Sequence, residues 1–163
     1  MIGRKTAAMV GVVTMFFVGG CGLFRPKPPF PMSLCLKASP ELQWYDGAAH
    51  TLYVRVFPLT AIDGFVSTDV SDLLADPPPT IVGSAGVPQS RMLHPSSSER
   101  LSFDPPKDRF FTQFGVVAGY YQPQGRLKLV LDVESIKGEE CHAIEFGPGG
   151  IQGGDVRKED KKE

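Results

Sequence analysis

Cys21 is the residue whose surroundings most clearly specify a chemical reaction. The apolar sequence FFVGG lies directly before it and Gly22 follows it. Two small residues before a cysteine, at the end of a short apolar run, are typical of a bacterial lipoprotein signal. A peptidase cuts such a signal before the cysteine, whose thiol becomes lipidated. We therefore expect residues 1–20 to be a signal peptide and Cys21 to be the lipid attachment site.

The residues before Cys21 have the charge and length of such a signal. Arg4 and Lys5 are the positive residues, and the apolar stretch 7–18 is too short to cross a bilayer core of roughly 30 Å as a helix. Gly22 follows the cysteine at the position where an aspartate would indicate retention in the inner membrane. By resemblance to enterobacterial sorting, this favours the outer membrane. An uncleaved membrane helix, or an ordinary signal with an incidental cysteine, is the alternative.

Cys35 and Cys141 remain once Cys21 is assigned to lipid attachment. Both fall in the outward phase of expected strands, and an even remainder of cysteines in an exported protein favours a disulfide. Residues on the same side of neighbouring strands can meet the Cα separation of roughly 4.4–6.8 Å that a disulfide requires. We predict that these two cysteines are bonded, with two unpaired thiols as the alternative.

The remaining polar residues form no recognisable catalytic or metal-binding motif. His50, His94 and His142 are the three histidines, and none forms a metal-like arrangement at helical spacing with another His, Cys or acid. Cys141 and His142 are adjacent, so they point to opposite faces of a strand. No nucleophile elbow, P-loop or GxGxxG sequence occurs. We expect no enzymatic activity, no metal, and no cofactor other than the covalent lipid on Cys21.

An aromatic pair in an expected surface loop is the strongest candidate for binding a partner. Pro40 follows the first expected strand, and Asp46 with Gly47 is a turn signal. The single tryptophan, Trp44, lies between them beside Tyr45. Both residue types are frequent interface hot spots, each contributing about 2 kcal/mol or more. The alternative is that Trp44 folds back and caps one end of the domain.

Alternation of apolar and polar residues predicts the strands that position these groups. Residues 32–38 alternate as a half-buried strand, and 50–60 is a strand that is apolar on both faces and must be covered on both sides. Arg55 in that strand is expected to pack beside a carboxylate. Gly115 and Gly119 indicate a bulge or a close backbone approach. Further strands are expected at 99–103, 110–121, 127–133 and 141–146.

One helical insertion interrupts the strands at about residues 62–75. Val70, Leu73 and Leu74 have helical spacing, and Ser67 or Thr68 is the expected N-cap. Three prolines after Asp76 end the helix. Seven or eight short strands without βαβ alternation predict an all-β fold, a two-sheet antiparallel β-sandwich with this small helical insertion.

Composition supports a single exported domain between a tether and a tail. The 18 glycines and 15 prolines favour a turn-rich β fold, and 17 Lys+Arg against 18 Asp+Glu give no basic face for nucleic acid. Residues 21–31 are expected to be the lipidated cysteine and a semi-rigid Pro-rich tether. The domain is assigned to 32–147, and the Gly-rich, charged residues 148–163 to a disordered tail.

Several of these segments together resemble a known family. They are the signal cysteine, a first strand ending in LKAS, the strand YVRVFPL followed by Phe65 and a helix over 70–74, and a late strand FGVVAGYY. This combination resembles the TssJ (VasD/SciN) family, the outer-membrane lipoproteins of the type VI secretion system. The resemblance covers roughly residues 32–135.

The resemblance implies a transthyretin-like β-sandwich without a catalytic site. It implies a structural lipoprotein, anchored by lipid at the periplasmic face of the outer membrane, that joins the type VI membrane complex by binding the periplasmic C-terminal region of a large inner-membrane TssM-like component. The loop between the first two strands makes this contact in the family, and here it is residues 40–49. The candidate contact residues are Pro40, Glu41, Leu42, Gln43, Trp44, Tyr45, Asp46 and Gly47.

The sequence is also compatible with two other functions. A periplasmic lipoprotein could bind or inhibit an envelope enzyme through the same aromatic loop. A transthyretin-like carrier of a small apolar ligand requires a cavity between its sheets, whereas the supply of Leu, Val and Phe favours a filled core.

Overall fold

The computed structural model describes residues 32–104, 111–135 and 141–152, and the expected signal peptide, Cys21 and the tether lie outside these ranges. No helix in the described ranges is long and apolar enough to cross a membrane. The described elements are β1 (Met32–Ala38), β2 (Leu52–Leu59), α1 (Asp63–Ser67), α2 (Val70–Leu74), β3 (Gln89–Leu93), β4 (Ser98–Phe103), β5 (Gln113–Ala118), β6 (Lys128–Asp132), the 3-10 turn Val133–Ser135 and β7 (His142–Phe146).

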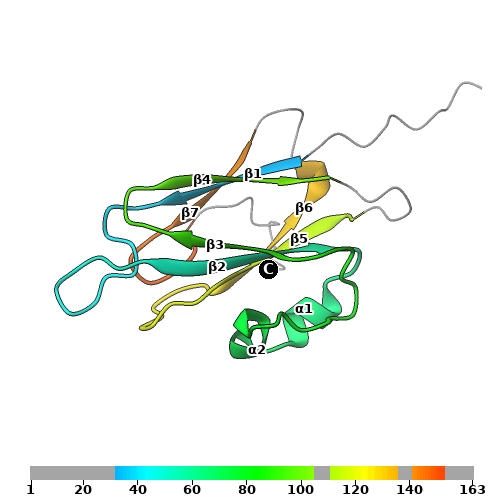
Figure 1. Ribbon diagram of the computed structural model, residues 1–163, viewed down its shortest axis with the longest axis horizontal. Coiled ribbons are helices and arrows are strands. Elements are labelled where there is room, and N and C mark those ends of the chain that lie inside the picture. The colour runs from blue at the N-terminus through cyan, green and yellow to red at the C-terminus, as the bar shows by residue number, and fades with distance from the viewer. Residues whose placement is uncertain (1–31, 105–110, 136–140, 153–163) are drawn as a thin grey trace, which may run out of the picture.

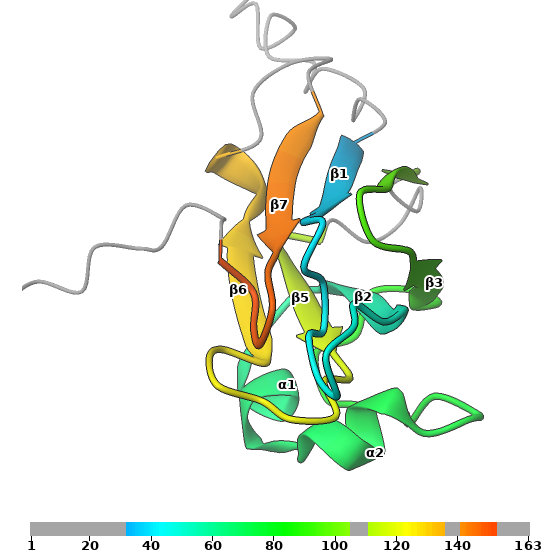
Figure 2. The ribbon, with the colours of Figure 1, turned by 90° about the vertical axis from the view of Figure 1, so that its left-hand side faces the viewer.

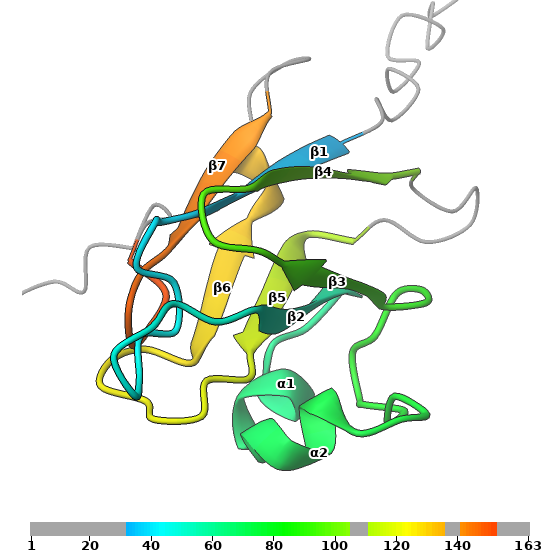
Figure 3. The ribbon, with the colours of Figure 1, turned by 60° about the vertical axis from the view of Figure 1, so that its left-hand side comes forward.

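Two sheets pack face to face (Figures 1 and 3). One sheet has the strand order β4-β1-β7 and the other the order β3-β2-β5-β6. Neighbouring strands are antiparallel except β1 and β7, which are parallel and lie side by side (Figure 2). The prediction of an all-β, two-sheet sandwich is confirmed.

Apolar side chains from every second strand position fill the space between the sheets. Leu34 and Leu36 of β1 face Leu52, Val54 and Val56 of β2 across this core, as the period of two predicts. Burial of apolar surface is the main contribution to folding, at about 25 cal/mol per Å². The core therefore fixes which side chains of each strand point outward.

A second apolar cluster lies outside the sandwich, between β2, β5 and the two helices (Figure 1). Phe57 of β2 and Val117 of β5 pack there against Phe65 and Leu73 from the helices. This cluster explains why β2 is apolar on both faces. Gly115 allows it to close, because a Cβ at that position would lie 2.8 Å from the ring of Phe65. The close approach expected at this glycine is present.

The single helix expected over 62–75 is wrong. Thr68 and Asp69 are extended, with ψ of 136° and 152°, and they separate α1 from α2. Ser67 and Thr68 are not N-caps. Their hydroxyls donate hydrogen bonds backward to the carbonyls of Asp63 and Gly64 in α1. Such local side-chain bonds compete with helix propagation.

The expected tail boundary at residue 148 is also wrong. Ile151 is only 5% exposed, belongs to the main core and forms a β-bridge with Phe146. The hydroxyl of buried Tyr120 donates hydrogen bonds to the carbonyls of Gly147 and Gly150. A glycine-rich sequence is therefore held in place by contacts from elsewhere in the chain. The folded domain reaches at least Gln152.

Candidate partner-binding site

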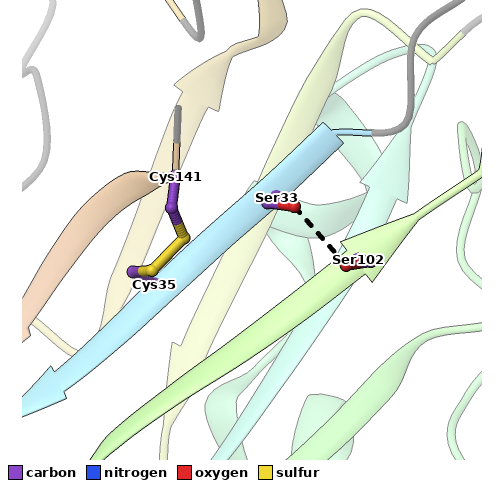
Figure 4. Close-up of a disulfide and its surroundings, with 4 residues drawn as sticks. All are labelled: Ser33, Cys35, Ser102 and Cys141. Carbon is purple, nitrogen blue, oxygen red and sulfur yellow. Dashed lines mark hydrogen bonds between the residues drawn. A yellow bond between two sulfur atoms is a disulfide. The ribbon is translucent and has the colours of Figure 1, made fainter. Parts of the chain in front are cut away.

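Cys35 and Cys141 form a disulfide with a Cα–Cα distance of 5.5 Å (Figure 4). The bond links β1 to the residue directly before β7, on the outer face of the three-stranded sheet. Ser33 and Ser102 lie on the same face, with their hydroxyls 3.4 Å apart. The middle of β1 is thus joined covalently to the residue before its parallel neighbour β7.

The expected binding loop lies at the far end of β1 from the tether. β1 begins at Met32, directly after the expected tether in the sequence, and the loop that follows Ala38 is at the opposite end of the sandwich (Figure 1). A strand of seven residues spans about 20 Å at 3.3 Å per residue. An attachment at one end therefore leaves the loop at the other end accessible.

The loop is an ordered hairpin with buried supports. Tyr45 and Ala48 exchange two backbone hydrogen bonds of 3.1 Å across Asp46 and Gly47. The φ angles of Asp46 and Gly47 are 51° and 75°, the left-handed pair of a type I′ turn. Leu42 is fully buried, and its carbonyl accepts a hydrogen bond from the backbone N of His50. The Asp-Gly turn signal is confirmed.

The aromatic residues of the loop differ in exposure. Trp44 is 48% exposed, and its backbone N donates a hydrogen bond to the carbonyl of Pro148. Tyr45 is half-buried and stacks on His50, with ring centroids 3.8 Å apart and planes at 13°. Leu42 and Gln43 are buried, so these two members of the predicted contact set support the loop from beneath. Pro40, Glu41, Trp44, Asp46 and Gly47 are exposed.

Tyr121 joins this surface although the sequence did not single it out. It is 72% exposed, its ring centroid lies 5.0 Å from that of Tyr45, and its backbone N donates a 3.0 Å hydrogen bond to Oε1 of Gln43. The strand expected over 110–121 would end at Tyr121, whereas β5 ends at Ala118. Gly119, just beyond that strand, was the local signal for an earlier end. The two loops lie side by side in Figures 1 and 3.

No protein-family model and no curated protein sequence matches this chain. Among solved structures, the type VI secretion lipoprotein TssJ1 from Pseudomonas aeruginosa is 25% identical with a TM-score of 0.63, over 77% of this chain and 95% of that chain. Serratia marcescens Lip, a membrane-bound component of the type VI secretion system, is 20% identical with a TM-score of 0.63, over 78% and 100%. These comparisons support a TssJ-family protein.

A further match has a similar fold. It is a chain in a structure described as the type VI secretion protein TssM C-terminal domain from EAEC, 17% identical with a TM-score of 0.62, over 75% of this chain and 95% of that chain. At this identity the match concerns the fold alone. The sequence motifs that resemble the TssJ family and the 25% identity to TssJ1 indicate the same fold.

Arg55 of the TssJ-like domain has a structural role, and its expected carboxylate neighbour is replaced by other acceptors. The side chain is 3% exposed and donates hydrogen bonds to the carbonyls of Leu73 and Ala75, at the end of α2. It also donates to the hydroxyls of Ser90 and Tyr53. Carbonyls at a helix C-terminus carry partial negative charge, so they suit a cation. Arg55 therefore holds α2 against the sheet.

The described part of the TssJ-like domain contains no group of three or more His, Cys, Asp or Glu residues that could hold a metal ion. His94 contacts Thr51 with a 3.2 Å hydrogen bond at the surface. A depression of about 430 Å³ lies beside the helices and is lined partly by Gly64, Thr68 and Ile81. The space between the sheets, where a carrier would hold an apolar ligand, is filled by the main core.

Proposed function

We propose that this chain is a structural lipoprotein of a type VI secretion membrane complex. In this proposal the lipid on Cys21 holds it at the periplasmic face of the outer membrane. Loop 40–49 binds the periplasmic C-terminal region of a TssM-like inner-membrane component, and the chain catalyses no reaction. Support comes from the likeness to the two lipoproteins and from structures described as the TssM C-terminal domain and as a type VI membrane complex.

The observation that carries the proposal is the position and rigidity of the aromatic loop. Trp44 is half-exposed on a hairpin that buried Leu42 and Gln43 support, at the end of the domain opposite the tether. A loop that is ordered before binding loses less conformational entropy when it meets a partner. A large aromatic ring held in this way is suited to fill an apolar pocket on that partner.

The experiment measures binding of the folded domain to the C-terminal periplasmic region of the TssM-like protein from the same organism, by isothermal titration calorimetry. Trp44→Ala should weaken binding at least tenfold, or about 1.4 kcal/mol, because the indole is a central contact. Val82→Ala is the matched control, since Val82 is 81% exposed and lies near the opposite end of β2.

Two results would contradict the proposal. If the native domain does not bind this region, the assigned partner is wrong. If Trp44→Ala and Tyr45→Ala both bind as tightly as the native domain, loop 40–49 is not the contact.

A further inference from the structure

Tyr121 is an exposed aromatic side chain that the core does not require. The residue is 72% exposed, and neither of the two buried clusters includes it. It nevertheless lies against the expected binding loop, because its ring centroid is 5.0 Å from that of Tyr45. Exposed aromatic residues that extend an aromatic surface are enriched in protein interfaces.

Gln43 fixes the position of Tyr121 relative to the loop. Its side-chain amide is buried, donates through Nε2 to the carbonyl of Thr51, and accepts at Oε1 the backbone N–H of Tyr121. One amide therefore connects the start of β2 with the turn after β5. Buried polar groups need such partners, because leaving one unpaired destabilises the fold.

We propose that the turn after β5 is a second part of the partner-binding surface, with Tyr121 as a contact residue and Gln43 as its positioning residue. This inference rests on the proposed function, since the occupant is the same TssM-like periplasmic region. Gln43 contributes through the position of Tyr121 and makes no contact of its own with that region.

The surface identifies the chemistry of its occupant. Tyr45 and Tyr121 form an aromatic pair with exposed Trp44 beside Tyr45 in the sequence, whereas Glu41, Asp46 and Arg126 are the exposed charged residues of the same two loops. The partner should therefore present an apolar patch with hydrogen-bond acceptors for the indole N–H and the phenol hydroxyls. Because exposed charges are screened by salt and apolar contacts are not, affinity should change less than threefold between about 0.05 and 0.5 M NaCl.

A double-mutant cycle tests both roles. Tyr121→Ala keeps the backbone N–H that bonds to Gln43, and it should weaken binding about fivefold to tenfold through loss of the ring. Gln43→Met keeps the length of the side chain but removes both hydrogen bonds, and it should weaken binding by a similar factor. In the Tyr121→Ala background, Gln43→Met should have almost no further effect on Kd. Thermal unfolding of each variant accompanies the titrations.

The outcomes separate this inference from the proposed function. If Trp44→Ala weakens binding and Tyr121→Ala does not, the turn after β5 is no part of the surface and the proposed function stands. If the losses from Gln43→Met and Tyr121→Ala are additive, Gln43 acts through general stability of the loop, and its positioning role is wrong. A tenfold fall in affinity with salt would show a charged occupant and overturn the assignment of an apolar one. If the native domain binds nothing, both proposals fail.

Discussion

Tyr120 shows how one buried hydroxyl organises the end of the domain where the binding surface is proposed. Its phenol donates hydrogen bonds of 3.2 and 3.0 Å to the carbonyls of Gly147 and Gly150. Burial raises the pKa of Tyr120 above its ordinary value of 10.0. The neighbouring Gly147 carbonyl also accepts a hydrogen bond from the backbone N of Gln43. The phenol thus connects the last turn of the domain with the support of the loop.

Replacement of Tyr120 by phenylalanine should lower the free energy of unfolding by about 1 kcal/mol at neutral pH, because two carbonyls lose a donor. The raised pKa also predicts how the free energy of unfolding changes with pH. The folded-state pKa lies above the unfolded value of about 10, so the contribution of the phenol is present below pH 10 and declines as pH rises further. Urea unfolding from about pH 9 to 11 should show a steeper loss for the native domain than for Tyr120→Phe. Parallel pH profiles would contradict this account.

At the scale of elements, two cations hold the helical insertion on the sheet. α1 and α2 have five residues each, too few to be stable in isolation. Arg55 binds carbonyls at the end of α2, and Nζ of Lys128 donates to the carbonyls of Phe65, Val66 and Thr68 at the end of α1. Both side chains project from strands toward helix C-termini, where a positive charge is favourable.

Lys128→Met should destabilise the domain by about 1–2 kcal/mol, because the aliphatic stem stays while three carbonyls lose a charged donor. The effect should be local. Amide hydrogen exchange should accelerate in α1 more than in β2, since the helix loses its attachment while the core between the sheets is unchanged. Lys37→Met is the control, because Lys37 is exposed on β1 and should change stability by less than about 0.5 kcal/mol. Equal acceleration in α1 and β2 would show that Lys128 supports the whole sheet.

Elements with a local signal were predictable from the sequence, and those fixed by distant contacts were not. Period-two alternation predicted β1 and β6, and the Asp46–Gly47 pair predicted its turn, because these signals act over a few neighbouring residues. The division between α1 and α2 depends in part on Lys128, which is 60 residues away from Thr68. The order of the glycine-rich end depends on Tyr120, and the place of Tyr121 depends on Gln43. No pattern within one segment reports such partners.

In the whole molecule, β1 is the direct connection between the two ends at which function is proposed. It starts directly after the expected tether, ends at the proposed binding loop, and is hydrogen-bonded to β4 on one side and β7 on the other. The Cys35–Cys141 disulfide adds a covalent link to the segment before β7 (Figure 4). The four-stranded sheet and the helices pack beside this connection. A pull between membrane and partner would therefore act along β1, where hydrogen bonds on both sides oppose its displacement.

This arrangement predicts that attachment and binding are separable. Cys21→Ser should leave the fold and the Kd for the TssM-like region unchanged, because residue 21 precedes the expected domain bounds in the sequence and the Cys35–Cys141 pair is intact. The variant should nevertheless leave the membrane fraction, since in the proposed function the acyl chains on Cys21 supply the attachment at about 0.8 kcal/mol per buried CH₂. The fractionation should be done in cells that lack the TssM-like protein, because a bound partner would itself retain the domain at a membrane. If Cys21→Ser still sediments with membranes in those cells, a segment other than the lipid anchors the protein. If it is released but no longer binds in calorimetry, the lipidated end takes part in recognition and the two ends are not independent.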